Sequence, residues 1–196
     1  ISFSVDTAES TGNFVIFSAP TFTITENESA PTVTLATSAT SIAENAGSSL
    51  TLTATLSVAT TADVTVSIST SGTGLEGTDY STISDITISA GATTGTASFT
   101  PTDDSVYEGN ETGIVAIATV SGGSATEDGT QSVTITITEN ESSPTVTLTT
   151  SASSIAENAG SSLTLTATLS VATTADVTVG ISTSGTGTEG TDYSAI

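Results

Sequence analysis

The chain has 196 residues, of which 21 are Asp or Glu, and it contains no Lys, Arg, His, Cys, Met or Trp, so its formal net charge is −21. Without His, Cys or Lys it cannot build a Ser-His-Asp triad, a thiol nucleophile, a zinc site or a Schiff base. Without Lys or Arg it cannot neutralise phosphates, which makes nucleic acids and anionic membranes poor partners. Most classes of enzyme are therefore excluded.

Seven segments alternate apolar residues with Thr or Ser, which is the pattern of half-buried strands. In chain order they cover residues 32–35, 50–56, 64–68, 86–88, 97–99, 114–120 and 133–137. One face of these segments is apolar and the other is almost entirely Thr, as two antiparallel sheets packed face to face require. No apolar run approaches the roughly 18 residues of a membrane helix. We expect an all-β fold, an immunoglobulin-like antiparallel β-sandwich of about seven strands.

The sequence repeats itself. Residues 31–83 align with residues 144–196 at an offset of 113, with five differences in 53 positions, and residues 23–29 match residues 136–142 throughout. A period of this length fits one β-sandwich and is too long for a solenoid coil. The repeat predicts tandem sandwiches, in which residues 1–29 are the C-terminal strands of a preceding repeat, residues 30–142 a complete repeat, and residues 143–196 the first four strands, or N-terminal half, of a following one. Because Ile1 begins nothing like a signal peptide, we expect an interior or processed segment.

The acidic residues gather at the ends of the predicted strands. They occur in Ala43-Glu44-Asn45, in Glu76-Gly77-Thr78-Asp79-Tyr80, in the stretch TDDSVYEGNE at residues 102–111, and in Glu139-Asn140-Glu141. If successive strands run up and down, several of these ends meet at one pole of the sandwich, where carboxylates without a basic partner repel one another. Calcium, which prefers hard oxygen ligands, would relieve that repulsion. The alternative is a self-repelling acidic surface suited to high salt.

In their order and spacing these motifs resemble the Calx-beta repeat, the calcium-binding sandwich of sodium–calcium exchangers that also occurs in large cell-surface and adhesion proteins. The resemblance covers the complete repeat and both partial ones. It implies calcium ions at one end of each sandwich, with a ligand set that consists of Glu44, Asp79, Asp103, Asp104, Glu108, Glu111, Glu139, Asn140 and Glu141. The implied counterparts in the partial repeats are Glu26, Glu28, Glu157 and Asp192.

Two positions depart from the family's pattern. The closing triplet is Glu-Asn-Glu where the best calcium binders of the family carry Asp, which implies a lower affinity or fewer ions. Gly113 stands where the family often has an aromatic core residue, which implies looser packing of that strand.

Some of these residues have a simpler interpretation. Asp79 can cap a turn through its own backbone, and Glu141 can be part of a linker. Four further acidic residues fit no cluster and are interpreted as solvated turn residues: Asp63, Asp85, Glu127 and Asp128. Asn27, Asn110 and Asn140 begin Asn-x-Ser/Thr sequons, and a glycan on Asn140 would compete with calcium at the same pole.

These observations favour a structural or adhesive repeat array, a stalk or fibre outside the cell or on its surface, made rigid by calcium at the repeat ends. Its expected partners are calcium ions, neighbouring repeats of the same or like chains, and cell-surface or matrix ligands. The alternatives are a calcium-sensing regulatory module and a filament subunit that polymerises by strand complementation. An enzyme would have to work with a carboxylate pair alone, as glycosidases do, and the lack of Trp disfavours that reading.

Overall fold

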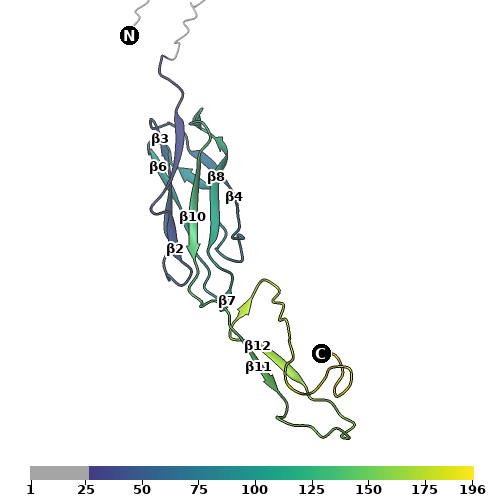
Figure 1. Cartoon of the computed structure of the whole chain (residues 1–196). Coiled ribbons are helices and arrows are strands. Elements are labelled where there is room, and N and C mark those ends of the chain that lie inside the picture. The colour runs from purple at the N-terminus through teal and green to yellow at the C-terminus, as the bar shows by residue number, and fades with distance from the viewer. Residues whose placement is uncertain (1–26) are drawn as a thin grey trace, which may run out of the picture.

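The computed structural model describes residues 27–196, and every regular element in that range is a strand (Figure 1). In chain order the strands are β1 (Thr32–Thr37), β2 (Ser41–Ala43), β3 (Leu50–Leu56), β4 (Val64–Gly72), β5 (Ile86–Ile88), β6 (Thr94–Phe99), β7 (Val106–Tyr107), β8 (Glu111–Ser121), β9 (Thr126–Glu127), β10 (Ser132–Thr138), β11 (Val146–Thr150), β12 (Leu165–Leu169) and β13 (Ala172–Thr173). The all-β prediction is confirmed. All seven predicted strands of residues 30–142 are present, and the short strands β2, β7 and β9 were not predicted.

Two sheets make up the sandwich. The first has the strand order β6-β3-β1-β9 and the second the order β2-β10-β8-β4-β5. Neighbouring strands are antiparallel except for the pairs β1–β9 and β2–β10, which are parallel. The predicted arrangement of antiparallel sheets is thus confirmed, with one parallel strand added at one edge of each sheet.

The alternation of the sequence explains which side chains fill the space between the sheets. On β3, Leu52, Ala54 and Leu56 are buried while the intervening Thr residues lie on the outer face. Val64 and Val66 on β4 are fully buried in the same core. The core is aliphatic apart from Tyr80 and Phe99, whose rings stack with centroids 4.6 Å apart. Burial of this apolar surface stabilises the fold.

Gly113 on β8 is tightly packed, contrary to the looser packing that the resemblance implied. A Cβ atom at Gly113 would lie 2.7 Å from Cε2 of Phe99 and 3.5 Å from Cε1 of Tyr80. The missing side chain therefore makes room for aromatic rings that come from β6 and from the turn after β4.

The chain changes sheets between β1 and β2. β1 pairs with β3 in the first sheet, and after Ser38 the chain crosses to the edge of the second sheet, where β2 runs parallel to β10. In this register Ala43 lies opposite Thr138, and the N–H of Glu44 donates to the carbonyl of Thr138 over 3.0 Å. Glu44 and Glu139 consequently leave neighbouring strands at the same end of the sandwich.

Residues 143–196 repeat only part of this arrangement. β11 and β12 pair antiparallel, with Val146 opposite Leu169, which is the register of Val33 and Leu56 in β1 and β3. Residues 177–185 correspond in sequence to β4 but form no strand, so the expectation of four strands here is wrong. β4 is held between β5 and β8, and the described residues offer no such partners to 177–185.

Within the described residues no helix is long and apolar enough to cross a membrane.

Candidate metal centre

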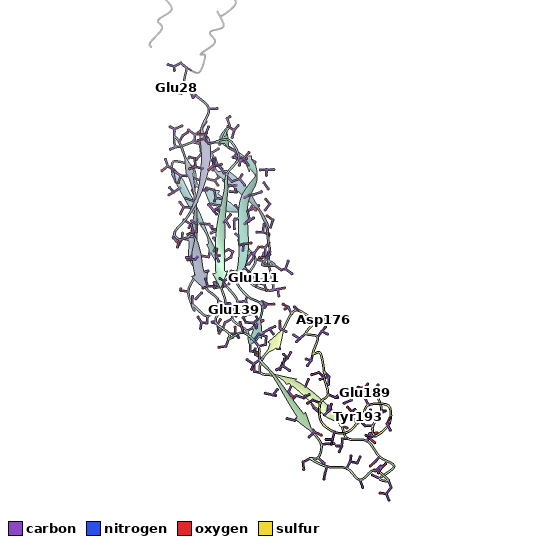
Figure 2. All side chains as sticks on the ribbon, viewed as in Figure 1. Glu28, Glu111, Glu139, Asp176, Glu189 and Tyr193 are labelled. Carbon is purple, nitrogen blue, oxygen red and sulfur yellow. The ribbon has the colours of Figure 1, made fainter. Side chains whose placement is uncertain are left out.

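Four segments of the complete repeat bring carboxylates to one end of the sandwich. They are the end of β2, the turn after β4, the loop between β6 and β8, and the end of β10. Figure 2 shows Glu111 and Glu139 at this end, close to the start of residues 143–196, and Glu28 at the opposite end. We call this end the carboxylate pole.

The first group at the pole, the Glu139 triad, consists of Glu44, Glu139 and Glu141. Each of the three offers a carboxylate oxygen, and these oxygens all lie within 4.8 Å of one another. Glu44 is only 8% exposed, and its Oε1 accepts a hydrogen bond of 3.3 Å from the N–H of Asp104. The parallel register of β2 and β10 is what brings Glu44 to Glu139.

Glu139 is the most strongly bound carboxylate of the pole. Its Oε2 accepts hydrogen bonds from the N–H groups of Glu108 (2.6 Å) and Gly109 (2.8 Å), and its Oε1 accepts from those of Asn140 and Glu141 (both 3.0 Å). Burial opposes ionisation of this group, but the hydrogen bonds outweigh it and lower the pKa of Glu139 to about 2. Glu139 is therefore a permanent negative charge.

The pKa of Glu44 is shifted in the opposite direction from that of Glu139. Burial, together with the negative charges of Glu139, Glu141 and Asp104, raises the pKa of Glu44 to about 7, although the backbone hydrogen bond from Asp104 works against this. Below about pH 7 the triad therefore holds a proton on Glu44, and a cation bound there would take the place of that proton.

Glu141 completes the triad. Its Oε1 accepts a hydrogen bond of 2.9 Å from Nδ2 of Asn140, while its Oε2 is buried and has no hydrogen-bond partner. A buried carboxylate oxygen without a donor is costly, and a cation in the triad would remove that cost.

The second group, the Glu111 triad, consists of Asp79, Glu108 and Glu111, whose ligand atoms also lie within 4.8 Å of one another. Glu111 begins β8 on the same face as Gly113, so its side chain lies at the edge of the core. Burial raises the pKa of Glu111 to about 7, and the charges of Asp79 and Glu108 add to the effect. Burial and the charge of Asp79 also raise the pKa of Glu108.

The turn after β4 fixes the position of Asp79. Oδ2 of Asp79 accepts a hydrogen bond of 2.6 Å from the N–H of Leu75, and the N–H of Asp79 donates to the carbonyl of Leu75 over 2.9 Å. Gly77 has a φ of +87°, which a glycine adopts without strain, and its N–H donates to the carbonyl of Tyr80. Asp79 is thus both the turn cap that its sequence context suggested and a member of the Glu111 triad.

The donor set fits calcium. Both triads offer carboxylate oxygens alone, and the sequence holds no nitrogen or sulfur ligand and no basic side chain that could neutralise them. The triads also act on each other, because the charge of Glu139 raises the pKa of Glu108 and that of Glu44 raises the pKa of Glu111. Hard oxygen ligands in this number suit calcium rather than zinc or copper.

Three residues of the predicted ligand set lie at the pole but outside both triads. Asp103, Asp104 and Asn140 are exposed. Oδ1 of Asp104 accepts a hydrogen bond of 2.7 Å from the N–H of Val106, so this side chain turns back onto its own loop. Glu44, Asp79, Glu108, Glu111, Glu139 and Glu141 are brought together as expected, and ligation by any of the nine stays a prediction.

The predicted ligands of the partial repeats are not part of either triad. Glu28 lies at the opposite end of the sandwich, Glu157 and Asp192 are exposed, and Glu26 lies outside the described residues. Asp192 nevertheless repeats the local geometry of Asp79, since its Oδ2 accepts a hydrogen bond of 2.8 Å from the N–H of Thr188. The turn forms from local sequence, whereas the triad needs the rest of the sandwich.

Two residues at the pole support the site without having been predicted to do so. Glu76 accepts hydrogen bonds of 2.7 Å from Oγ1 of Thr70 and from the N–H of Ile83, which holds the turn of Asp79 against the sheet. Oδ1 of Asn110 accepts a hydrogen bond of 3.0 Å from the N–H of Glu139. The motif around Glu76 was visible in the sequence, but the contact of Asn110 with Glu139 spans 29 residues and left no local signal.

The four acidic residues interpreted as solvated lie away from the pole. Asp63, Asp85 and Asp128 are exposed and Glu127 is half-buried. Several accept hydrogen bonds from nearby backbone; Asp63 accepts from the N–H of Ala90 over 2.8 Å, and Asp85 from that of Ile68 over 3.1 Å. These hydrogen bonds connect loops of the sandwich to the neighbouring backbone.

Comparison with known proteins gives a family and two similar structures. A family model described as the Calx-beta domain matches residues 12–142 and 139–196. The apo-form Calx CBD1 domain is 17% identical over 56% of this chain and 99% of that one, with a TM-score of 0.47. CBD12 from CALX1.2 is 18% identical over 50% of this chain and 40% of that one, with a TM-score of 0.44. No curated protein matches the chain.

Proposed function

This chain belongs to the Calx-beta family, and on that basis we propose that it is a structural repeat array whose calcium ions bind at the carboxylate pole of each sandwich and stiffen the connection to the next repeat. Calx-beta domains are calcium-binding modules and do not form a catalytic family. The array forms a stalk or fibre with an adhesive role, outside the cell or on its surface, where calcium is abundant.

The observation that carries the proposal is the pair of carboxylate triads in a chain without a single Lys, Arg or His. Six carboxylates lie in two groups that repel each other, two of them have a pKa of about 7, and one buried oxygen has no donor. A divalent ion in each triad would satisfy all three features at once. Asp103 and Asp104 lie next to the triads and would join the ligand set if their loop turned inward.

The position of the pole supports the mechanical part of the proposal. Glu141 is followed by only Ser142 and Ser143 before Pro144, and β11 begins at Val146. An ion held by Glu139 and Glu141 would therefore fix the first residues of the linker to the sandwich. Such an ion restricts the angle between consecutive repeats.

Calcium titration of the full chain tests the proposal. We expect saturable binding by calorimetry and a rise in the melting temperature that follows the same saturation curve. Asp128→Asn is the matched control, because it removes one charge at the end of the sandwich remote from the pole. A titration without binding heat, or binding that Glu44→Gln and Glu111→Gln leave unchanged, would overturn the proposal.

The same titration separates a structural array from a calcium-sensing module. A structural site saturates well below the calcium concentration of its surroundings and changes stability more than shape. A sensor would change its hydrodynamic radius in the physiological range with a smaller change in melting temperature.

A further inference from the structure

The structure shows how the complete repeat contacts the residues that follow it. β13 adds in parallel to β7, with Ala172 opposite Val106 and Thr173 opposite Tyr107. Oγ of Ser143 donates a hydrogen bond of 3.1 Å to the hydroxyl of Tyr107. β7 lies in the loop of residues 103–110, which we call the docking loop and which also carries Glu108. In Figure 1 this contact lies at the junction of the two parts of the chain.

The segment that pairs with the docking loop, around Ala172 and Thr173, has an identical counterpart in the sequence of the complete sandwich. At the offset of 113, residues 171–174 correspond to residues 58–61, and both segments read Val-Ala-Thr-Thr. The segment 58–61 lies along a groove of about 450 Å³ that Glu28, Pro31, Gly123 and Ser124 also line. We call it the docking groove. It lies at the end of the sandwich opposite the carboxylate pole, as the position of Glu28 in Figure 2 shows.

Hydrogen bonds within the sandwich hold the floor of the docking groove. Oγ1 of Thr60 donates to the carbonyl of Ala62 over 2.7 Å, and the carbonyl of Thr60 accepts from the N–H of Gly91 over 2.8 Å. A carbonyl oxygen has a second lone pair, so this oxygen can accept a further hydrogen bond. Val58 is 50% exposed at the groove and offers an apolar surface to an aromatic side chain.

We propose that the docking groove receives the docking loop of a preceding repeat of the same kind, by the parallel pairing that β7 and β13 form. Each repeat then carries a docking loop at its carboxylate pole and a docking groove at the other end, so that one contact serves the whole array. Ala30 stands where the following repeat has Ser143, so this joint lacks the hydrogen bond to the tyrosine hydroxyl and depends on backbone pairing and on Val58. The inference rests on the array of the proposed function and adds the surface that joins its members.

Disulfide trapping tests the joint, because the chain has no Cys of its own. In the full chain, Val106→Cys with Ala172→Cys gives the reference yield of a disulfide at the observed contact. In an extended chain that contains residues 30–142 twice in succession, Val106→Cys in the first copy and Ala59→Cys in the second should reach a similar yield. Val106→Cys with Thr96→Cys, which is exposed on β6, is the control and should stay unlinked.

A second variant checks the joint without cysteines. In the extended chain, Val58→Asp in the second copy should broaden the distribution of end-to-end distances in small-angle scattering, and Thr96→Asp should not. Cross-linking at Ala59 no better than at Thr96, or equal scattering of the two variants, overturns the inference.

The readouts keep this inference apart from the calcium proposal. Calcium binding with no cross-link at Ala59 contradicts the docking groove alone. A cross-link at Ala59 in a chain that binds no calcium supports the groove and contradicts the calcium proposal alone.

Discussion

At the scale of single residues, the carboxylate pole contains two opposite kinds of acid. Glu139 is stabilised as an anion by four backbone N–H groups, whereas Glu44 is buried beside other negative charges. The anion of Glu139 stabilises the ion-free fold, whereas the anion of Glu44 destabilises it. Both become ligands in the proposed site, so substitutions should affect stability and calcium binding independently.

Neutralising these two residues should therefore have opposite effects on the ion-free protein. At pH 8, Glu44→Gln should raise the free energy of unfolding by about 1–2 kcal/mol, because it removes a charge that the site disfavours. Glu139→Gln should lower it by about 1–3 kcal/mol, because an amide cannot accept all four backbone hydrogen bonds. Both should weaken calcium binding at least tenfold. Chemical denaturation and calorimetry measure the two quantities, and changes of the same sign in stability would contradict this account.

The pKa values also predict the effect of pH. The pKa of Glu44 and Glu111 is about 7 in the folded chain and near 4.5 when unfolded, so their contribution to stability is complete below 4.5 and is lost as the pH rises through 7. The contribution of Glu139, whose pKa is about 2 in the folded chain, depends on pH in the opposite direction: it is complete above 4.5 and is lost as the pH falls through 2. The ion-free protein should be most stable near pH 4.5–5.

Calcium reverses this dependence, because it competes with the protons on Glu44 and Glu111. The rise in melting temperature that calcium produces should be larger at pH 8 than at pH 5.5. Thermal melts of metal-free protein with and without added calcium at both pH values measure it. An increment that is the same at both pH values would mean that these two carboxylates do not bind the ion.

At the scale of elements, the packing of β8 against β6 depends on Gly113. A methyl group there would lie 2.7 Å from the ring of Phe99, which is itself stacked on Tyr80. Gly113→Ala should therefore destabilise the chain by about 1–3 kcal/mol. Gly129→Ala is a useful comparison, since no atom lies within 4 Å of a Cβ there, although its φ of +67° adds backbone strain. Equal stability of Gly113→Ala and the parent chain would show that the rings have room to move.

Sequence periodicity predicted the long strands but not the short ones. Seven segments with alternating Thr and apolar residues became β1, β3, β4, β5, β6, β8 and β10. β2 has only three residues, too few for a pattern, yet its parallel register places Glu44 beside Glu139. The membership of the Glu139 triad therefore followed from the family resemblance and could not be derived from local sequence.

The two copies of the repeat show why strands are not a local property. Residues 177–185 differ from β4 at one position, Gly180 for Ser67, but form no strand in the absence of partners for both edges. The turn that ends in Tyr80 in the complete repeat also forms in the second copy, where it ends in Tyr193, because its hydrogen bonds stay within six residues. Local turns of the candidate site could thus be predicted from sequence, whereas its assembly required the sandwich.

At the scale of the whole molecule, the carboxylate pole and the docking loop occupy the same junction between repeats. The N–H groups of Glu108 and Gly109 in that loop donate to Glu139, and Tyr107 next to them contacts Ser143. An ion at the pole would hold the loop in the conformation that meets the following residues. The array should accordingly be stiffer with calcium than without it.

Removing calcium should thus lower the melting temperature of the full chain and broaden its distribution of shapes. Small-angle scattering of calcium-loaded and chelator-treated chain measures both the mean dimension and its spread. Identical scattering curves and melting temperatures in excess chelator would contradict a mechanical role for the ion.

The most direct measurement is an anomalous difference map from crystals of the full chain grown with calcium. The account predicts density for one ion bounded by Glu44, Glu139 and Glu141, and for another bounded by Asp79, Glu108 and Glu111. Ordered carboxylates at the pole with no anomalous density between them, at a saturating calcium concentration, would contradict it.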